Sequence, residues 1–230
     1  MTSSGALTFD RPAIIVGGGR IAWDDLRALR ARGYAMIAAD GAADTLQDEG
    51  LIPDAIIGDL DSLSSRDGWA GVEIIHVLEQ DTTDFEKCLY STDAPLYFGF
   101  GLIGKRVDHT LAAFHVLHRY AAEKALVLVD EIDVVMPLIG PFSLDVGAGT
   151  RVSLYPLARL GFDASSGLKY PLEDFEMEPG IAIGVSNEAV AERVSWTPDD
   201  VSVPYLLIMD KQWLDPLIDW RLKKVIAAPD

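Results

Sequence analysis

The fold is decided by residues 35–61, which read AMIAADGAADTLQDEGLIPDAIIGDLD. Two short apolar runs, 35–39 and 55–57, each end next to an aspartate, and the segment between them has the pattern of a helix that continues through Leu46. Continuous apolar strands that alternate with helices are typical of a parallel sheet covered on both faces. This stretch therefore predicts an α/β unit.

The same alternation continues on both sides of this stretch. Further buried strands are expected at 13–16, 72–77, 96–98 and 126–129, and helices at 83–90 and 107–122. On the second helix, apolar side chains recur at spacings of three and four residues and predict its buried face; they are Val107, Leu111, Phe114 and Leu117.

The pattern changes after residue 131. Short strand-like segments follow one another, separated by turns rich in Gly and Pro, at 133–138, 143–146, 151–157, 181–185, 193–196 and 203–209. Such a series is typical of an antiparallel sandwich or a small barrel. We therefore expect an α/β domain over residues 1–131 and an all-β sandwich domain over 132–230, with a final helix over 213–224.

Composition excludes several classes of protein. The 230 residues include 19 Lys and Arg and 36 Asp and Glu, for a formal charge of −17, which argues against a non-specific nucleic-acid binder. The single Cys88 excludes an internal disulfide and a multi-cysteine zinc site. No apolar run approaches the ~18 residues of a membrane span, and residues 1–12 lack the pattern of a signal peptide. We expect a soluble cytoplasmic protein with neither nucleic-acid nor membrane partners.

Acidic residues follow four successive predicted strands. They are Asp40, then Asp59 and Asp61, then Asp81 and Asp84, and finally Asp108. In an open α/β sheet the ligand crevice lies beyond the carboxyl ends of the strands, so these side chains are expected to share one edge. Carboxylates gathered there need protonation or a cation, and Mg²⁺ prefers carboxylate and phosphate oxygens. The alternative for any single aspartate is a loop or N-cap role.

A few Lys and Arg side chains lie near these acidic loops in the sequence. Arg20 follows the turn 17–19, Lys87 lies one turn into the helix after Asp84, and Lys105 and Arg106 precede Asp108. Carboxylates that hold Mg²⁺ beside basic groups are what phosphoryl transfer requires. The glycine turn alone is weak evidence, because it matches neither the P-loop nor the dinucleotide fingerprint and is equally explained as a tight turn.

The remaining reactive side chains favour structural roles. His115 and His118 lie three residues apart on the polar side of the long helix, with no further zinc ligand nearby, and are expected at the surface. His76, inside an apolar strand, and Cys88 are expected to be structural.

Six ordered motifs resemble the thiamine pyrophosphokinase family, over about residues 14–190. They read ADGAA at 39–43, PD at 53–54 with IGDLDS at 57–62, QDTTDFEK at 80–87, GKRVDHTL at 104–111, SGLKYPL at 166–172 and VSNE at 185–188. The resemblance implies transfer of the diphosphate of ATP to the hydroxyl of thiamine, giving thiamine diphosphate and AMP. It also implies an α/β nucleotide domain followed by a β-sandwich, and a homodimer with active sites at the subunit interface.

By the same resemblance, residues receive roles. Catalysis is assigned to Asp59, Asp61, Asp84 and Asp108, and Mg²⁺ binding to Asp40, Asp59, Asp61 and Asp84. ATP binding is assigned to Gly18, Arg20, Asp40, Gly41, Asp81, Thr83, Lys87, Arg106 and His109. Thiamine binding is assigned to Leu168, Tyr170, Ser186 and Asn187, from the partner subunit.

Three positions depart from the family pattern. Ala42 and Lys105 stand where the family usually has Gly, and Tyr170 stands where it commonly has Trp. A smaller ring at residue 170 implies weaker stacking on thiamine or a different alcohol as acceptor. Two alternatives therefore stay open: a diphosphokinase acting on another alcohol such as a hydroxymethylpterin, and a non-catalytic dimer that binds nucleotide or thiamine.

Overall fold

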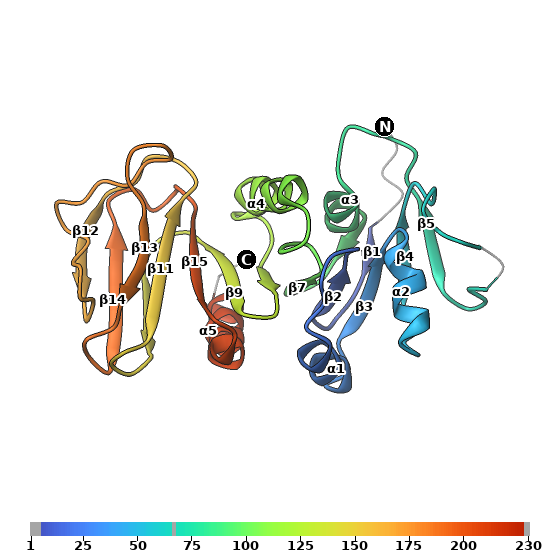
Figure 1. The fold of residues 1–230 in the computed structure, drawn as a ribbon, viewed down its shortest axis with the longest axis horizontal. Coiled ribbons are helices and arrows are strands. Elements are labelled where there is room, and N and C mark those ends of the chain that lie inside the picture. The colour runs from blue at the N-terminus through green and yellow to red at the C-terminus, as the bar shows by residue number, and fades with distance from the viewer. Residues whose placement is uncertain (1–5, 66–67, 228–230) are drawn as a thin grey trace. The chain divides into compact units, whose positions relative to one another are not determined.

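The computed structural model of the protein describes residues 6–65 and 68–227. The chain forms two compact units (Figure 1). Unit 1 is the described part of Met1–Val116 together with Lys124–Glu131, and unit 2 is Leu117–Glu123 together with the described part of Ile132–Asp230. Within the described ranges, no helix is both long enough and apolar enough to cross a membrane.

Unit 1 contains six parallel strands in the order β8-β7-β2-β3-β4-β5 (Figure 1). Their bounds are β2 Ala13–Val16, β3 Ala35–Ala39, β4 Ala55–Gly58, β5 Glu73–His76, β7 Tyr97–Phe100 and β8 Leu126–Val129. Strands β1 Leu7–Thr8 and β6 Thr92–Asp93 form a separate two-stranded parallel sheet in the same unit. Five of the six strands are buried at every residue, as continuous apolar runs require.

The sixth strand, β5, differs from expectation. The sequence pattern predicts a buried strand with a structural histidine, but β5 lies at the edge of the sheet and its four residues are half-buried or exposed. His76 is exposed. An edge strand loses the cover that a neighbouring strand and its helix would give, so its apolar residues do not imply burial.

The helices of unit 1 are α1 Trp23–Ala31, α2 Ala42–Asp48, α3 Asp84–Ser91 and the first part of α4 Val107–Tyr120. Helix α3 packs against β3 and β4, and it buries Cys88 completely. The predicted buried face of α4 is wrong in its first turns, because Val107 is 76% and Leu111 63% exposed in the single chain. The buried residues of α4 are Ala113, Val116, Leu117 and Tyr120, so Leu117 of the predicted face is buried and Phe114 is half-buried. His115 and His118 are exposed, as predicted.

Unit 2 consists mainly of two antiparallel sheets, ordered β13-β11-β15-β9 and β10-β14-β12. Their bounds are β9 Asp133–Leu138, β10 Phe142–Asp145, β11 Arg151–Pro156, β12 Phe162–Ser166, β13 Gly184–Glu188, β14 Arg193–Pro198 and β15 Tyr205–Asp210. Trp196 of one sheet donates its indole N–H to the hydroxyl of Tyr205 in the other at 2.8 Å, and that hydroxyl donates to the Gly140 carbonyl at 2.8 Å. These buried contacts join the two sheets. The chain is thus a mixed α/β protein with a sheet-rich second unit.

Two elements of unit 2 differ from the sequence pattern. Strand β12 was not expected, because its sequence FDASS offers one buried apolar residue. Strand β13 begins at Gly184 rather than at residue 181. The final helix is present as η1 Lys211–Trp213 followed by α5 Leu214–Ala227.

Candidate active site

Three aspartates meet at the carboxyl ends of β3 and β4. Asp40 follows β3, and Asp59 and Asp61 follow β4; one carboxylate oxygen of each lies within 4.8 Å of the others. The parallel pairing of β3 with β4 explains this meeting, because both strands end at the same edge of the sheet. Asp84 is the first residue of α3, and its negative charge contributes, after burial, to the raised pKa of Asp40.

Asp40 is the buried member of the cluster. Its side chain is 3% exposed, its Oδ2 accepts a hydrogen bond from the backbone N–H of Ser62 at 3.2 Å, and its Oδ1 is buried with no hydrogen-bond partner. Burial raises the pKa of Asp40, and the negative charges of Asp84 and Asp59 raise it further, against the lowering effect of Ser62. A buried carboxylate oxygen without a donor is a position for a cation. The donor set of this cluster, all oxygen, fits Mg²⁺.

The backbone at these strand exits is held in unusual conformations. Asp40 has a φ of +46° and Leu60 a φ of +62°, both in the left-handed region. A Cβ on Gly58 would lie 2.7 Å from the Cβ of Asp40, so only glycine permits this approach of the two strands. Strain of this kind at a strand exit is typical of functional loops.

Lys87 is a buried cation between two of the carboxylates. Its side chain is 2% exposed, and its Nζ lies 3.1 Å from Asp84 Oδ1 and 3.8 Å from Asp59 Oδ2. Burial alone would lower the pKa of Lys87, but the hydrogen bond to Asp84 and the charges of Asp84, Asp59 and Glu79 together raise it. Lys87 is therefore charged and fixed. Gln80 donates from Nε2 to Asp59 Oδ2 at 2.6 Å and lowers the pKa of that carboxyl group.

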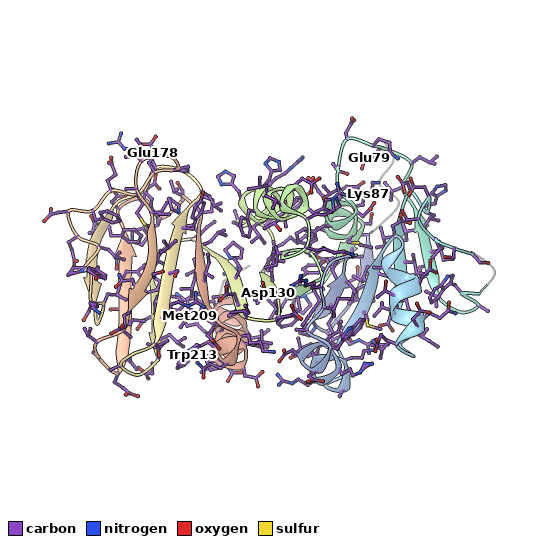
Figure 2. The ribbon with its side chains drawn as sticks, in the orientation of Figure 1. Glu79, Lys87, Asp130, Glu178, Met209 and Trp213 are labelled. Carbon is purple, nitrogen blue, oxygen red and sulfur yellow. The ribbon has the colours of Figure 1, made fainter. Side chains whose placement is uncertain are left out.

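Glu79 organises the loop that carries these groups, and it has no sequence signal beyond its position before the QDTTD motif. Its carboxylate accepts from the backbone N–H of Asp81 at 2.7 Å and of Thr82 at 3.1 Å, from the Thr82 hydroxyl, and from the Tyr90 hydroxyl at 2.8 Å. The hydrogen bonds from the Thr82 and Tyr90 hydroxyls lower the pKa of Glu79 to about 2. Figure 2 shows Glu79 and Lys87 at the same end of unit 1.

A cavity of about 580 Å³ opens above the carboxylates, and all of its lining residues belong to unit 1. It contains nine of the residues assigned by the sequence, namely Gly18, Asp40, Gly41, Asp59, Thr83, Asp84, Lys87, Arg106 and His109. Four others are not among the lining residues, namely Arg20, Asp61, Asp81 and Asp108. Of these, Asp61 belongs to the aspartate cluster, and Arg20 lies 3.6 Å from Glu131.

Arg106 and Asp108 form an exposed pair at the rim of the cavity. The guanidinium donates to both carboxylate oxygens of Asp108, at 2.5 and 3.1 Å. These hydrogen bonds lower the pKa of Asp108 to about 2. Asp108 is thus anionic and occupied with Arg106, which suits positioning of the arginine.

The glycine turn 17–19 has two of its backbone donors already in use. The N–H of Gly17 donates to the Phe100 carbonyl at 2.8 Å, and the N–H of Gly19 to the Gly101 carbonyl at 2.7 Å. A Cβ at Gly19 would lie 2.5 Å from the Gly101 oxygen, so the turn is pressed against the loop after β7. These two N–H groups are therefore not available to a phosphate group.

The four residues assigned to thiamine lie in unit 2. Asn187 is 5% exposed; its Oδ1 accepts from the Tyr170 N–H at 3.1 Å and its Nδ2 donates to the Tyr170 carbonyl at 2.7 Å. The Tyr170 ring is 61% exposed, whereas Leu168 is buried. Ser186 is exposed and has a φ of +59°, and its N–H donates to the Ser153 hydroxyl at 2.9 Å. Asn187 therefore fixes the backbone that presents Tyr170.

The arrangement in unit 1 defines a class of protein. Carboxylates suited to a divalent cation, a buried lysine and an arginine around one cavity at the carboxyl edge of a parallel sheet are typical of enzymes that transfer phosphoryl groups.

Comparisons with known proteins identify the family. Residues 27–129 match the model of the thiamin pyrophosphokinase catalytic domain, and residues 142–198 match that of the thiamin pyrophosphokinase vitamin B1 binding domain. Together the two models match more than half of the chain. The chain therefore belongs to the thiamine pyrophosphokinase family.

Individual relatives agree with this assignment. The chain is 27% identical to thiamin pyrophosphokinase 1 of Caenorhabditis elegans over 176 residues, which cover 69% of this chain and 72% of that protein. It is 26% identical to the thiamine pyrophosphokinase of Bacillus subtilis over 194 residues, which cover 78% of this chain and 90% of that protein. Among solved structures, that of thiamin pyrophosphokinase from Geobacillus thermodenitrificans has a TM-score of 0.72 at 26% identity and covers 86% of this chain and 97% of the other.

Proposed function

We propose that this protein transfers the diphosphate group of ATP to the hydroxyl of thiamine and releases AMP. The observation that carries the proposal is the site of unit 1: Asp40, which has a buried oxygen without a hydrogen-bond partner, forms a carboxylate cluster with Asp59 and Asp61. Asp40 and Asp59 line one cavity together with Lys87. Family membership supports the same reaction, since members of the thiamine pyrophosphokinase family are ATP-dependent diphosphokinases.

Within this proposal, the cluster of Asp40, Asp59 and Asp61 would hold Mg²⁺, with Asp84, whose charge acts on Asp40, as a further ligand. The cation would neutralise the negative charge that ATP brings to the carboxylates. Lys87 is fixed next to Asp59 and Asp84 and adds a positive charge at the floor of the cavity. The space for ATP is lined by Gly18, Gly41, Thr83, Arg106 and His109. Three other residues with proposed roles, Arg20, Asp81 and Asp108, are not among the lining residues of the cavity. The protein therefore contributes mainly position and charge.

We further propose that unit 2 binds thiamine through the Tyr170 ring and Ser186, with Leu168 and Asn187 supporting the loop. A cationic thiazolium ring stacks favourably on an aromatic face, and the Tyr170 ring is exposed for such contact. The domain roles follow as catalysis in residues 1–131 and thiamine binding in 132–230. A homodimer also stays a proposal, supported by the position of β13 at the edge of its sheet, with β11 on one side, and by its exposed Val185. A cytoplasmic location stays a prediction from the sequence.

The experiment is a product assay with protein, ATP, Mg²⁺ and thiamine, in which nucleotides and thiamine esters are separated by chromatography. We expect AMP and thiamine diphosphate in equal amounts, dependent on both thiamine and Mg²⁺. Asp59→Asn is the matched variant; it removes one charge from the cluster and is expected to abolish turnover while the protein stays folded by circular dichroism.

Other outcomes would direct the assignment elsewhere. AMP formed only with another primary alcohol, such as a hydroxymethylpterin, would keep the reaction and change the acceptor. ATP binding without any product would indicate a non-catalytic binding protein. Activity of Asp59→Asn near that of the wild type would remove Asp59 from the metal site. Light scattering on the same preparation measures the mass and tests the dimer.

A further inference from the structure

The cavity of unit 1 is lined by a lysine at a position where the family usually has no charged side chain. Lys105 lies in the loop between β7 and α4, where the family usually has glycine, and its side chain is exposed and lines the cavity. Its Nζ donates to the carbonyl oxygen of Gly18 at 3.3 Å, across 87 positions of sequence. The lysine therefore reaches from one strand-exit loop to the glycine turn of another.

The other cations of the cavity are already paired with carboxylates. Lys87 is bound by Asp84 and Asp59, and Arg106 is bound by both oxygens of Asp108. Among the described residues that line the cavity, Lys105 is the lysine or arginine for which the structure gives no carboxylate partner. A long, weakly held ammonium group can turn to an incoming anion at little cost, since it gives up a single long hydrogen bond to a carbonyl group.

Two of the three backbone N–H groups in the glycine turn beside Lys105 already have partners. The N–H groups of Gly17 and Gly19 donate to the carbonyl oxygens of Phe100 and Gly101, at the end of β7 and directly after it, so they are not available to a ligand. Gly18 lines the cavity, and a Cβ built on it would meet no atom within 4 Å, so open space lies in front of it. The ammonium group of Lys105 is therefore held at the border of this open region.

We propose that Lys105 binds the polyphosphate chain of the nucleotide and thereby sets the affinity of this protein for ATP. The inference rests on the proposed function for the identity of the nucleotide. The group that it binds is a phosphate oxygen, because the cavity contains three carboxylates that repel anions, and Lys105 adds a cation without a carboxylate partner to the charge of the proposed Mg²⁺. Lysine is a common ligand of nucleotide phosphates, as a point charge without strict geometry.

The test compares Lys105→Met and Lys105→Arg with the wild type. Lys223→Met, on the exposed surface of α5, is the matched control that makes the same chemical change away from the cavity. Initial rates are measured against ATP and against thiamine, and calorimetry measures the binding of Mg²⁺ with ATP, and of AMP, to protein without thiamine. For an exposed charge near a phosphate we expect the KM for ATP to rise about fivefold in Lys105→Met.

The remaining readouts separate phosphate binding from a structural role. We expect kcat and the KM for thiamine to change less than twofold, AMP binding to change less than ATP binding, and Lys105→Arg to restore the KM for ATP. An unchanged ATP affinity in Lys105→Met would overturn the proposal. So would equal losses for ATP, AMP and thiamine together with a lower Tm, because these would show that Lys105 only fastens the glycine turn.

Failure of the proposed function would look different. If the wild type forms no thiamine diphosphate but binds ATP, and Lys105→Met binds ATP about fivefold more weakly, the proposed function fails, either in its acceptor or in its turnover, and the inference about Lys105 stands. If the wild type is active and Lys105→Met is indistinguishable from it, the inference alone fails. If the wild type binds no ATP in the presence of Mg²⁺, both fail.

Discussion

The substitution Asp40→Asn should stabilise the protein without Mg²⁺ and remove its response to Mg²⁺. In the wild type the Oδ1 of Asp40 is buried without a donor, and one oxygen each of Asp59 and Asp61 lies within 4.8 Å of an Asp40 oxygen. An asparagine oxygen still accepts the hydrogen bond from the Ser62 N–H, and its amide group can donate to a neighbouring carboxylate. Asparagine also tolerates the φ of +46° at this position.

The magnitude follows from these contacts. Two unit charges about 4.8 Å apart repel by about 1 kcal/mol in water and by about 3 kcal/mol at an effective dielectric constant of 20. Loss of one charge should therefore raise the free energy of unfolding by about 1–2 kcal/mol, which corresponds to about 2–8 °C in Tm for a chain of this size. Mg²⁺ at about 100 times its Kd adds about 2.7 kcal/mol to the free energy of unfolding of a protein with an intact site. In saturating Mg²⁺ the wild type should therefore be more stable than Asp40→Asn.

The dependence on pH provides an internal check. The pKa of Asp40 is raised, chiefly by burial, from its ordinary value of 3.8, so the folded wild type binds this proton more tightly than the unfolded chain. The ionised carboxyl group therefore destabilises the folded state at neutral pH, and this cost disappears as the pH falls through the raised pKa and below 3.8. The advantage of Asp40→Asn should be full at pH 7 and absent at about pH 3.

The assay is thermal and urea unfolding in EDTA and in saturating Mg²⁺, with Asp48→Asn as control. Asp48 is an exposed residue of α2 outside the cluster, so its amidation should leave both curves nearly unchanged. The reasoning is refuted if Asp40→Asn is less stable than the wild type in EDTA at pH 7, or if Mg²⁺ stabilises both proteins equally.

Two further substitutions test other parts of the description. Glu79→Gln should lower the free energy of unfolding by about 1–2 kcal/mol at pH 7, because hydrogen bonds to a carboxylate are lost. Since the pKa of Glu79 is lowered from 4.5 to about 2, this difference in urea unfolding should shrink as the pH falls between these values, and a difference independent of pH would contradict the role of the charge. Tyr170→Trp should lower the KM for thiamine about two- to fivefold in steady-state kinetics, by a larger stacking face; an unchanged or higher KM would exclude stacking at this position.

The strand positions of unit 1 were predictable because each buried strand is a continuous apolar run that ends at a turn. The burial of helix residues was less predictable. Val107 and Leu111 have the spacing of a buried face, yet they precede the turn where α4 begins to pack. Periodicity therefore located the helix and its buried Leu117 but placed the start of the buried face too early. Strand β12 was missed because its sequence, FDASS, is mostly polar and its pairing with β14 depends on backbone hydrogen bonds, which the side-chain pattern does not report.

The site was predictable to the extent that residue type and strand order decide it. Asp40 and Asp59 meet because adjacent parallel strands end together, a consequence of topology. Glu79 was missed because a glutamate in a loop has no distinguishing sequence signal; its importance comes from donors that fold around it. The position of Lys105 over Gly18 was equally hidden, since it joins residues 87 positions apart.

The two hydrogen bonds between the Asn187 side chain and residue 170 bear on which substitutions residue 170 can accept. Both hydrogen bonds go to the main chain of Tyr170, and the ring itself is largely exposed. Neither hydrogen bond uses the side chain of residue 170, so both can be kept when that side chain changes. A lineage can exchange tyrosine, tryptophan or phenylalanine there by few nucleotide changes without repacking a core. On the proposed role of Tyr170, the ring that contacts the acceptor can therefore change while both hydrogen bonds from Asn187 stay in place.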